Sequence, residues 1–245
     1  MASPAPVYRY RPMLQSGRCD DAQLLLRFFD SALPYLASIG SGAQWGSERF
    51  SSRPTSVARI ANFIALSDAT HAGGVPFAHS DWCKAFVAER RLSRDEAEQP
   101  HVRALLDEAG QGHGQVQGHE QELSGGGIWL PVAAMLLCSR PCDYLASIWP
   151  GQDDADPFVF LRYLISDHRA GTLSKGAAGS LLALARKEAE ALGIRRICGD
   201  CWNGNERKLV KYYESKGFQP VDDFVKPAGP DGEAPWPGTA YELRW

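Results

Sequence analysis

The sequence of 245 residues contains no long apolar segment. Its longest apolar run, Ile128 to Cys138, is about half as long as a membrane-spanning helix must be. The first residues, Met-Ala-Ser-Pro-Ala-Pro, have neither the basic segment nor the apolar segment of a secretory signal. We therefore expect a cytoplasmic protein without a membrane partner.

An excess of positive charge is also missing. The chain has 26 Lys and Arg against 29 Asp and Glu, for a net charge of −3. Surfaces that bind nucleic acid are usually strongly basic. The composition therefore predicts no nucleic-acid partner.

Spacings that would hold a metal are absent, although the chain has six cysteines. Cys198 and Cys201 lie in an apparent strand over 195–202, where residues three apart point to opposite faces. Cys138 and Cys142 flank Ser-Arg-Pro, which is not a usual zinc spacing. Without a secretory signal, disulfides are disfavoured. We expect buried reduced thiols and no metal.

Two common phosphate-binding loops are missing as well. A Walker A loop ends in Gly-Lys-Ser/Thr, but here Lys175 precedes Gly176. No Gly-x-Gly-x-x-Gly with a following acidic residue matches the dinucleotide fingerprint.

Apolar periodicity divides the chain into strands and helices. The predicted elements are a strand at 8–13, helices at 20–36 and 55–66, strands at 84–89, 128–138 and 157–166, a helix at 178–192, a strand at 194–202, a helix at 206–216, and strands at 218–225 and 239–245. The order β-α-α-β-β-β-α-β-α-β-β predicts a single α/β domain, residues 1–245, with a mixed sheet flanked by helices.

Residues 92–127 differ in character from the rest of the chain. This segment is polar and glycine-rich, and 110–118 has too few apolar residues to pack. Only 102–109 suggests a helical turn or two. We expect a partly mobile surface insertion in which His101, His113 and His119 are solvated.

The most informative stretch runs from Asp167 to Phe218. Within it, the turn Ser174-Lys175-Gly176-Ala177-Ala178-Gly179-Ser180 opens a long amphipathic helix. A helix start with little side-chain bulk presents free backbone N–H groups and a positive dipole end. Such a start suits a pyrophosphate. The glycines could alternatively serve helix packing.

This turn, Asn205 and the sequence Tyr213-Glu-Ser-Lys-Gly-Phe218 together resemble the GNAT family of acyl-CoA N-acyltransferases. In that family an Arg/Gln-x-x-Gly-x-Gly/Ala motif starts the third helix, and Tyr-Glu-x-x-Gly-Phe closes the next one. Ser174 and Ala177 depart from the first motif, and Lys175 could supply the lost cation. The resemblance implies a mostly antiparallel sheet and acetyl-CoA as co-substrate.

The resemblance also assigns roles. The cofactor pyrophosphate would bind at Ser174, Lys175, Gly176, Ala177, Gly179 and Ser180. A backbone N–H of Leu164 or Ile165 would polarise the thioester carbonyl. Tyr213 would protonate the leaving thiolate, with its neighbour Tyr212 as the alternative. Asn205 would bind the pantetheine arm, or it is simply a helix N-cap.

A second motif lies near the N-terminus. The segment Ser38-Ile-Gly-Ser-Gly-Ala-Gln44-Trp45 resembles the Gly-x-x-Gln-Trp element that follows the first helix of many GNAT proteins. Gln44 and Trp45 would contact the acceptor substrate, or they would anchor this loop to the core. The residue types also offer four candidate general bases, Glu89, Asp167, His168 and Asp200. The sequence selects none of them, and a water chain to solvent is an equal alternative.

The predicted function is therefore acetyl-CoA-dependent N-acetylation of a primary amine on a small molecule, by a monomer or homodimer without a metal. Two alternatives stay open. One is a GNAT-like module that binds acyl-CoA without turnover, and the other is a protein or peptide N-acetyltransferase.

Overall fold

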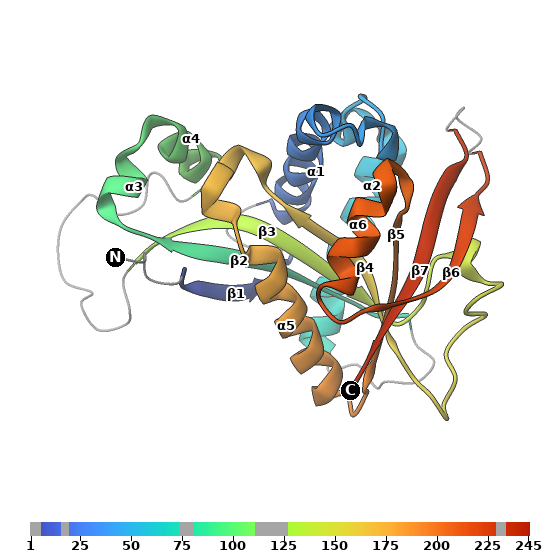
Figure 1. Cartoon of the computed structure of the whole chain (residues 1–245). Coiled ribbons are helices and arrows are strands. Elements are labelled where there is room, and N and C mark those ends of the chain that lie inside the picture. The colour runs from blue at the N-terminus through green and yellow to red at the C-terminus, as the bar shows by residue number, and fades with distance from the viewer. Residues whose placement is uncertain (1–5, 16–19, 74–80, 111–126, 229–233) are drawn as a thin grey trace.

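One mixed sheet organises the computed structural model, which describes residues 6–15, 20–73, 81–110, 127–228 and 234–245. The described residues form a seven-stranded sheet in the order β1-β2-β3-β4-β5-β7-β6 (Figure 1). Its strands are β1 Tyr8–Pro12, β2 Cys83–Leu92, β3 Ile128–Cys138, β4 Val159–Ser166, β5 Arg196–Trp202, β6 Gln219–Lys226 and β7 Trp236–Arg244. All neighbours are antiparallel except β4 and β5. The predicted mixed, mostly antiparallel sheet is confirmed.

Helices α1 (Asp21–Ser38) and α2 (Pro54–Gly73) cover one face of the sheet. The predicted start of α1 is confirmed, because the Asp20 side chain caps the helix by accepting from the Gln23 N–H at 3.0 Å. The apolar stripe of α1 packs with Ile60 and Ile64 of α2 on the middle strands, in a core that includes Val87 and Leu136. This face is called the α1/α2 face below.

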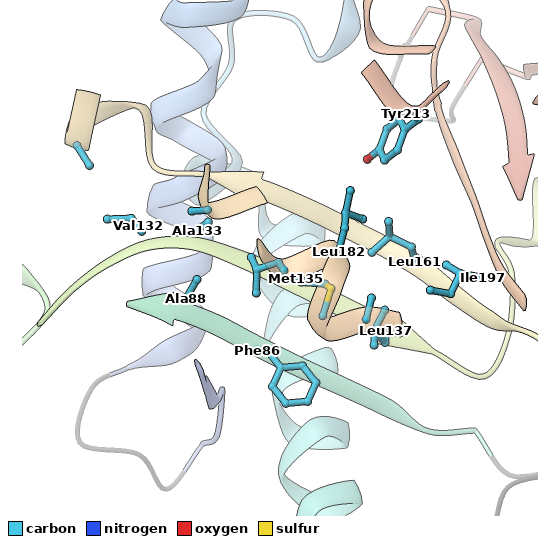
Figure 2. Packing of buried hydrophobic residues seen from close by; sticks show 14 of the residues in the cluster. Phe86, Ala88, Val132, Ala133, Met135, Leu137, Leu161, Leu182, Ile197 and Tyr213 are labelled. Carbon is cyan, nitrogen blue, oxygen red and sulfur yellow. The ribbon is translucent and has the colours of Figure 1, made fainter. Parts of the chain in front are cut away.

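The other face carries α5 (Ala177–Ala191) and α6 (Gly204–Glu214). The side chains of α5 that recur every three or four residues, among them Leu181, Leu182 and Ala185, are buried against β2, β3 and β4. Figure 2 shows this packing from close by, with Leu182 among Met135, Leu137 and Leu161. We call this the α5/α6 face.

The insertion expected at 92–127 proves to be partly structural. Helices α3 (Arg94–Glu98) and α4 (Pro100–Glu108) follow β2 directly, and α3 has a capping box between Ser93 and Glu96. Val102, Leu105 and Leu106 of α4 are buried in the core of the α5/α6 face. The helical turn or two expected at 102–109 is confirmed as part of α4, and the expectation of a surface segment was wrong for the buried face of this helix. His101 is exposed, as expected, while His113 and His119 lie outside the described residues.

The loop between β3 and β4 covers the α1/α2 face near β5 and β7. Its residues Cys142, Leu145 and Trp149 pack with Phe158, Phe160 and Cys198. Cys201, three residues further along β5, belongs instead to the core of the α5/α6 face. The prediction that Cys198 and Cys201 point to opposite faces is confirmed.

Candidate functional site where β4 and β5 diverge

Strands β4 and β5 pair over only part of their length. The parallel ladder joins Val159, Phe160 and Leu161 to Ile197, Cys198 and Gly199, and then stops. Both strands continue, β4 to Ser166 and β5 to Trp202. We call the unpaired stretches, 162–166 and 200–202, the splay. Its backbone groups on the facing edges have no strand partner.

A bulge in β4 marks the point of divergence. Leu136 of β3 pairs with Tyr163 and the next residue, Leu137, pairs with Leu161, so Arg162 is the extra residue on β4. A bulge bends its strand and increases the local twist. The divergence of β4 from β5 follows from this extra residue.

Leu164 and Ile165, the residues predicted to polarise a carbonyl, both lie in the splay. Leu164 packs on the α5/α6 face, while Ile165 is buried on the α1/α2 face. Successive backbone N–H groups of a strand point to opposite edges, so one of the two faces β3 and the other faces the splay. Their proposed role stays a prediction.

The start of α5 has the open form expected from the sequence. Gly176 is the N-cap at φ 92°, a left-handed conformation that favours glycine, and it has no side-chain cap. No atom lies within 4 Å of where a Cβ on Gly179 would be. Helix packing therefore does not explain Gly179. The Ala177, Ala178 and Gly179 N–H groups precede the first helical bond, from Ser180 N to Gly176 O, and are free for an anion.

The polar side chains of this turn differ in whether they are free to bind a ligand. The hydroxyls of Ser174 and Ser180 donate to the carbonyls of Gly171 and Ala177, at 2.9 and 2.7 Å. Lys175 is exposed. Its carbonyl accepts a 2.7 Å hydrogen bond from the hydroxyl of Tyr8 on β1. Of the predicted phosphate-binding side chains, Lys175 is thus the one that is exposed and charged.

Tyr213 enters the α5/α6 face from α6 and belongs to the same core cluster as Leu182 and Leu161 (Figure 2). It is 7% exposed, and its ring stacks on Tyr241 with centroids 4.2 Å apart. Burial raises the pKa of Tyr213, so the phenol is neutral at pH 7.

The side chain of Tyr241 lowers the pKa of Tyr213, but burial outweighs this effect. Gly199 makes room for this pair, because a Cβ there would lie 2.7 Å from the Tyr241 ring.

Asn205 lies on a left-handed turn at the start of α6. Asn205, Glu206 and Arg207 have φ of 48°, 57° and 59°, where residues other than glycine are strained. The cap of α6 is Asn203, so Asn205 is not the N-cap. The Asn205 side-chain amide donates to Ile39 O at 2.9 Å and Ser41 Oγ at 2.6 Å. It ties α6 to the loop after α1.

Gln44 and Trp45 lie in and after a short 3-10 helix, Gly42–Gln44. Trp45 packs edge-on against Phe29 and Phe50. The carbonyl of Gln44 accepts a 2.9 Å hydrogen bond from the indole N–H of Trp236 on β7. These contacts favour the role of a core anchor, and contact with an acceptor stays a prediction.

The four candidate bases differ in the groups that they contact. Glu89 is fully buried and paired with Arg9 and Arg11. Asp167 accepts two hydrogen bonds from the Arg169 guanidinium, at 2.9 and 2.8 Å.

His168 stacks on Tyr35 with ring centroids 4.0 Å apart, and burial lowers its pKa. Asp200 differs from all of these, because it lies in the splay and has no arginine or lysine ion-pair partner among the described residues.

Asp200 lies beside the residues Tyr144, Cys142 and Arg162. The Tyr144 hydroxyl donates to Asp200 Oδ2 at 3.0 Å, and Cys142 Sγ is 4.0 Å from Oδ1. Burial raises the pKa of Asp200 to about 6, against smaller lowering effects of Tyr144, Arg162 and Lys226. The sequence already held a signal for this buried group, because Asp200 is the single carboxylate in the apolar strand Ile-Cys-Gly-Asp-Cys-Trp.

No group of three or more metal-ligating side chains occurs among the described residues. The five described cysteines are free and buried. Within the same part of the chain, no helix is both long enough and apolar enough to cross a membrane.

Comparisons with known proteins identify the fold. No protein-family model and no curated protein match the chain. Among solved structures, a GNAT-family acetyltransferase from Listeria monocytogenes is 15% identical, with 97% of this chain and 95% of that one covered and a TM-score of 0.50. The NatC complex bound to Gag peptide and CoA is 10% identical, with 97% and 98% covered and a TM-score of 0.50.

A third structure, of yncA from Salmonella typhimurium with its cofactor acetyl-CoA, is 12% identical, with 97% and 93% covered and a TM-score of 0.49. At these low identities the likeness concerns the fold. The chain has the fold of the GNAT acetyltransferases, which confirms the fold expected from its motifs.

Proposed function

We propose that this chain, which has the GNAT fold, is an acetyl-CoA-dependent N-acetyltransferase that acts on a primary amine of a small molecule. The observation that carries the proposal is the order of two features along the chain. The unpaired end of β4 leads through a short connection to the uncapped, glycine-containing start of α5. A thioester and its pyrophosphate need these two kinds of site, one after the other.

The residues of the site then have distinct tasks. The N–H groups of Ala177, Ala178 and Gly179 bind the pyrophosphate, and Lys175 adds a positive charge. One free N–H of the splay, from Leu164 or Ile165, polarises the thioester carbonyl. The Oδ1 of Asn205 accepts from an amide N–H of the pantetheine arm, because its own amide N–H groups are already used.

Tyr213 is the general acid of the proposed reaction. The amine nitrogen attacks the thioester carbonyl, the C–S bond breaks, and the thiolate takes the Tyr213 proton. A buried phenol stays protonated until the thiolate forms, and the stacked ring of Tyr241 holds the Tyr213 ring in place. No metal enters the proposed mechanism.

Adjacent tyrosines provide a matched test. Tyr213→Phe should lower kcat about 10²-fold or more, with little change in acetyl-CoA affinity. Tyr212→Phe removes the same hydroxyl from a half-buried ring beside it and should leave kcat within about twofold. The measurement is free-thiol release from acetyl-CoA over a panel of amines. Equal rates for the two variants would remove Tyr213 from the mechanism.

Binding without turnover is the second candidate function, and the burial of Tyr213 favours it. Calorimetric titration with acetyl-CoA and thiol release separate the two. Binding without release on every amine, and on a peptide N-terminus included in the panel, would support the binding module. Release on the peptide alone would support a protein N-acetyltransferase.

A further inference from the structure

Two opposite charges occupy the first positions of the splay. Leu161 and Gly199 are the last paired residues of β4 and β5, and the next residues are Arg162 and Asp200. Each is the only charged residue of its described segment within the splay, among apolar neighbours. Burying a charge without need is costly.

Both side chains lie on the α1/α2 face. The Arg162 guanidinium is 5.4 Å from the ring centroid of Phe63 on α2 and donates to Cys142 Sγ at 2.7 Å. Asp200 accepts from Tyr144 of the same β3–β4 loop. Tyr213 belongs to the core of the opposite face. The splay thus has the proposed acid on one side and this charged pair on the other.

The two charges do not neutralise each other directly. The thiol of Cys142 is 2.7 Å from Arg162 Nη1 and 4.0 Å from Asp200 Oδ1, and no ion pair joins Arg162 to Asp200 in the described part of the chain. Arg162 has no carboxylate partner among the described residues. Arg162 is partly exposed, and its guanidinium has further N–H donors besides the one directed at Cys142.

Such a pair of separate, half-buried charges is complementary to a molecule that carries both signs. A guanidinium binds a carboxylate through paired N–H donors. A carboxylate beside it attracts an ammonium group. The charged groups that face Asp200 are Arg162 and Lys226, and its other titratable neighbours are Tyr144, Cys142, Cys201, Tyr213 and Tyr241.

We propose that the acceptor is an amino acid, with its carboxylate on Arg162 and its amino group at Asp200, which is the general base. This inference rests on the N-acetyltransferase function proposed above and names its substrate class. The aromatic rings of Phe63 and Tyr163 beside Arg162 border the same site.

The proton balance of the reaction is complete with these groups. The ammonium group gives one proton to the Asp200 carboxylate, and the neutral nitrogen attacks the thioester carbon. The C–S bond breaks as the C–N bond forms, and the thiolate receives the Tyr213 proton. The second proton of the nitrogen returns to the Tyr213 phenolate, and Asp200 releases its proton to water.

The first test compares each amino acid with its own carboxamide, which keeps the amine and removes the negative charge. Wild-type protein should have a kcat/KM at least about 10-fold higher for the acid. A binding measurement that needs no turnover runs beside it. In calorimetry of the CoA-saturated protein, N-acetyl amino acids should bind and N-acetyl amino acid amides should bind at least about 10-fold more weakly.

Variants then test the separate roles of Arg162 and Asp200. Arg162→Gln should remove the discrimination between acid and amide by raising KM for the acid, and Arg162→Lys should restore part of it. Asp200→Asn should lower kcat on both acceptors. Arg186→Gln is the control, because it removes the same charge from α5, where Arg186 lies over Trp245. It should change neither the preference for acid over amide nor kcat.

The outcomes separate the two proposals. Equal kcat/KM and equal binding for acids and amides would overturn the amino-acid acceptor while leaving the N-acetyltransferase standing. Discrimination that survives Arg162→Gln would overturn the role of Arg162. Binding of N-acetyl amino acids without thiol release on any amine would support the acceptor site and contradict the enzymatic function.

Discussion

At the scale of single residues, the partner of a carboxylate decides what it can do. Glu89 and Asp167 form ion pairs with arginines, so their negative charges stabilise the fold and are not available as bases. Asp200 has a tyrosine hydroxyl and a thiol instead, and burial raises its pKa to about 6. A group that titrates near neutrality and lies at an unpaired strand end is suited to proton transfer. Sequence alone did not rank Glu89 against Asp200, because their partners are distant in sequence.

Asp200→Asn should stabilise the protein at neutral pH. The pKa of Asp200 is raised from 3.8 to about 6 on folding, so the folded state holds the proton more tightly than the unfolded state does. Stability is then greatest below pH 4 and falls as pH rises through 6. Asparagine cannot ionise, so the variant should gain about 3 kcal/mol at pH 7 and only about 0.5 kcal/mol at pH 4.

Urea denaturation at both pH values measures this difference. The same substitution should abolish the acidic limb near pH 6 in the kcat/KM profile, where the wild type gains activity as Asp200 loses its proton. Asp153→Asn, in the exposed part of the β3–β4 loop, is the control for the loss of one carboxylate. A variant that is less stable than the wild type at pH 7 would show that the charge of Asp200 stabilises the fold.

At the scale of elements, the local sequence pattern was enough to predict the bounds of an element that is long and strongly apolar. Strand β3 has the bounds predicted for it, 128–138, because its apolar run is bounded by Gly127 and by Ser-Arg-Pro at 139–141. Helices α3 and α4 were not predicted as packed elements, since their few apolar residues acquire a partner only when the chain folds over the sheet. The Asn203-Gly204-Asn205 sequence signals a turn, but nothing local shows that Glu206 and Arg207 continue it in the left-handed region.

The splay could not be predicted from sequence for a different reason. It depends on the register of β4 against β3, in which Arg162 is the extra residue. Register is a property of two paired strands, and alternation within one strand does not reveal a bulge. The anion-binding helix start, by contrast, is local, and the glycines at 176 and 179 predicted it.

The start of α5 can be tested by placing a negative charge in it. Gly179→Asp should weaken acetyl-CoA binding about 10-fold or more, because a carboxylate would repel the pyrophosphate. The fold should not suffer, since space around Gly179 is open and an acidic residue in the first turn favours the helix dipole. Calorimetric titration and a melting curve give the two results.

Ala183→Asp is the matched control for that variant. Residue 183 is exposed on the same helix, one turn further along, so it adds the same charge away from the helix start. Its effect on affinity should be several-fold smaller than that of Gly179→Asp, because its charge lies about 6 Å further along the helix from the N–H groups that bind the pyrophosphate. Equal weakening by both variants would mean that α5 affects the cofactor only through net charge.

At the scale of the whole molecule, the N-terminal strand supports the helix start that lies far from it in sequence. β1 is an edge strand, and its Tyr8 hydroxyl donates to the carbonyl of Lys175 in the turn before α5. β1 is in turn fixed by a buried network. Arg9 and Arg11 bond to Glu89 of β2 at 2.6 and 3.0 Å, and Arg11 also bonds to Asp21 of α1 at 2.8 Å.

Breaking this network should therefore affect both stability and the cofactor site. Glu89→Gln leaves the arginines without their shared carboxylate, and we expect a loss of about 3 kcal/mol in the free energy of unfolding. Glu190→Gln breaks the exposed pair with Arg186 and should cost less than about 0.5 kcal/mol. Denaturant titration measures both values.

The same two variants test the connection from β1 to α5. If β1 holds the turn through Tyr8, Glu89→Gln should weaken acetyl-CoA binding at a temperature where the variant is still folded, and Tyr8→Phe should weaken it without a large loss of stability. Glu190→Gln should leave affinity unchanged, although it lies on α5 itself. Unchanged affinity in both Glu89→Gln and Tyr8→Phe would show that the helix start is held by the sheet core alone, and that β1 contributes only to stability.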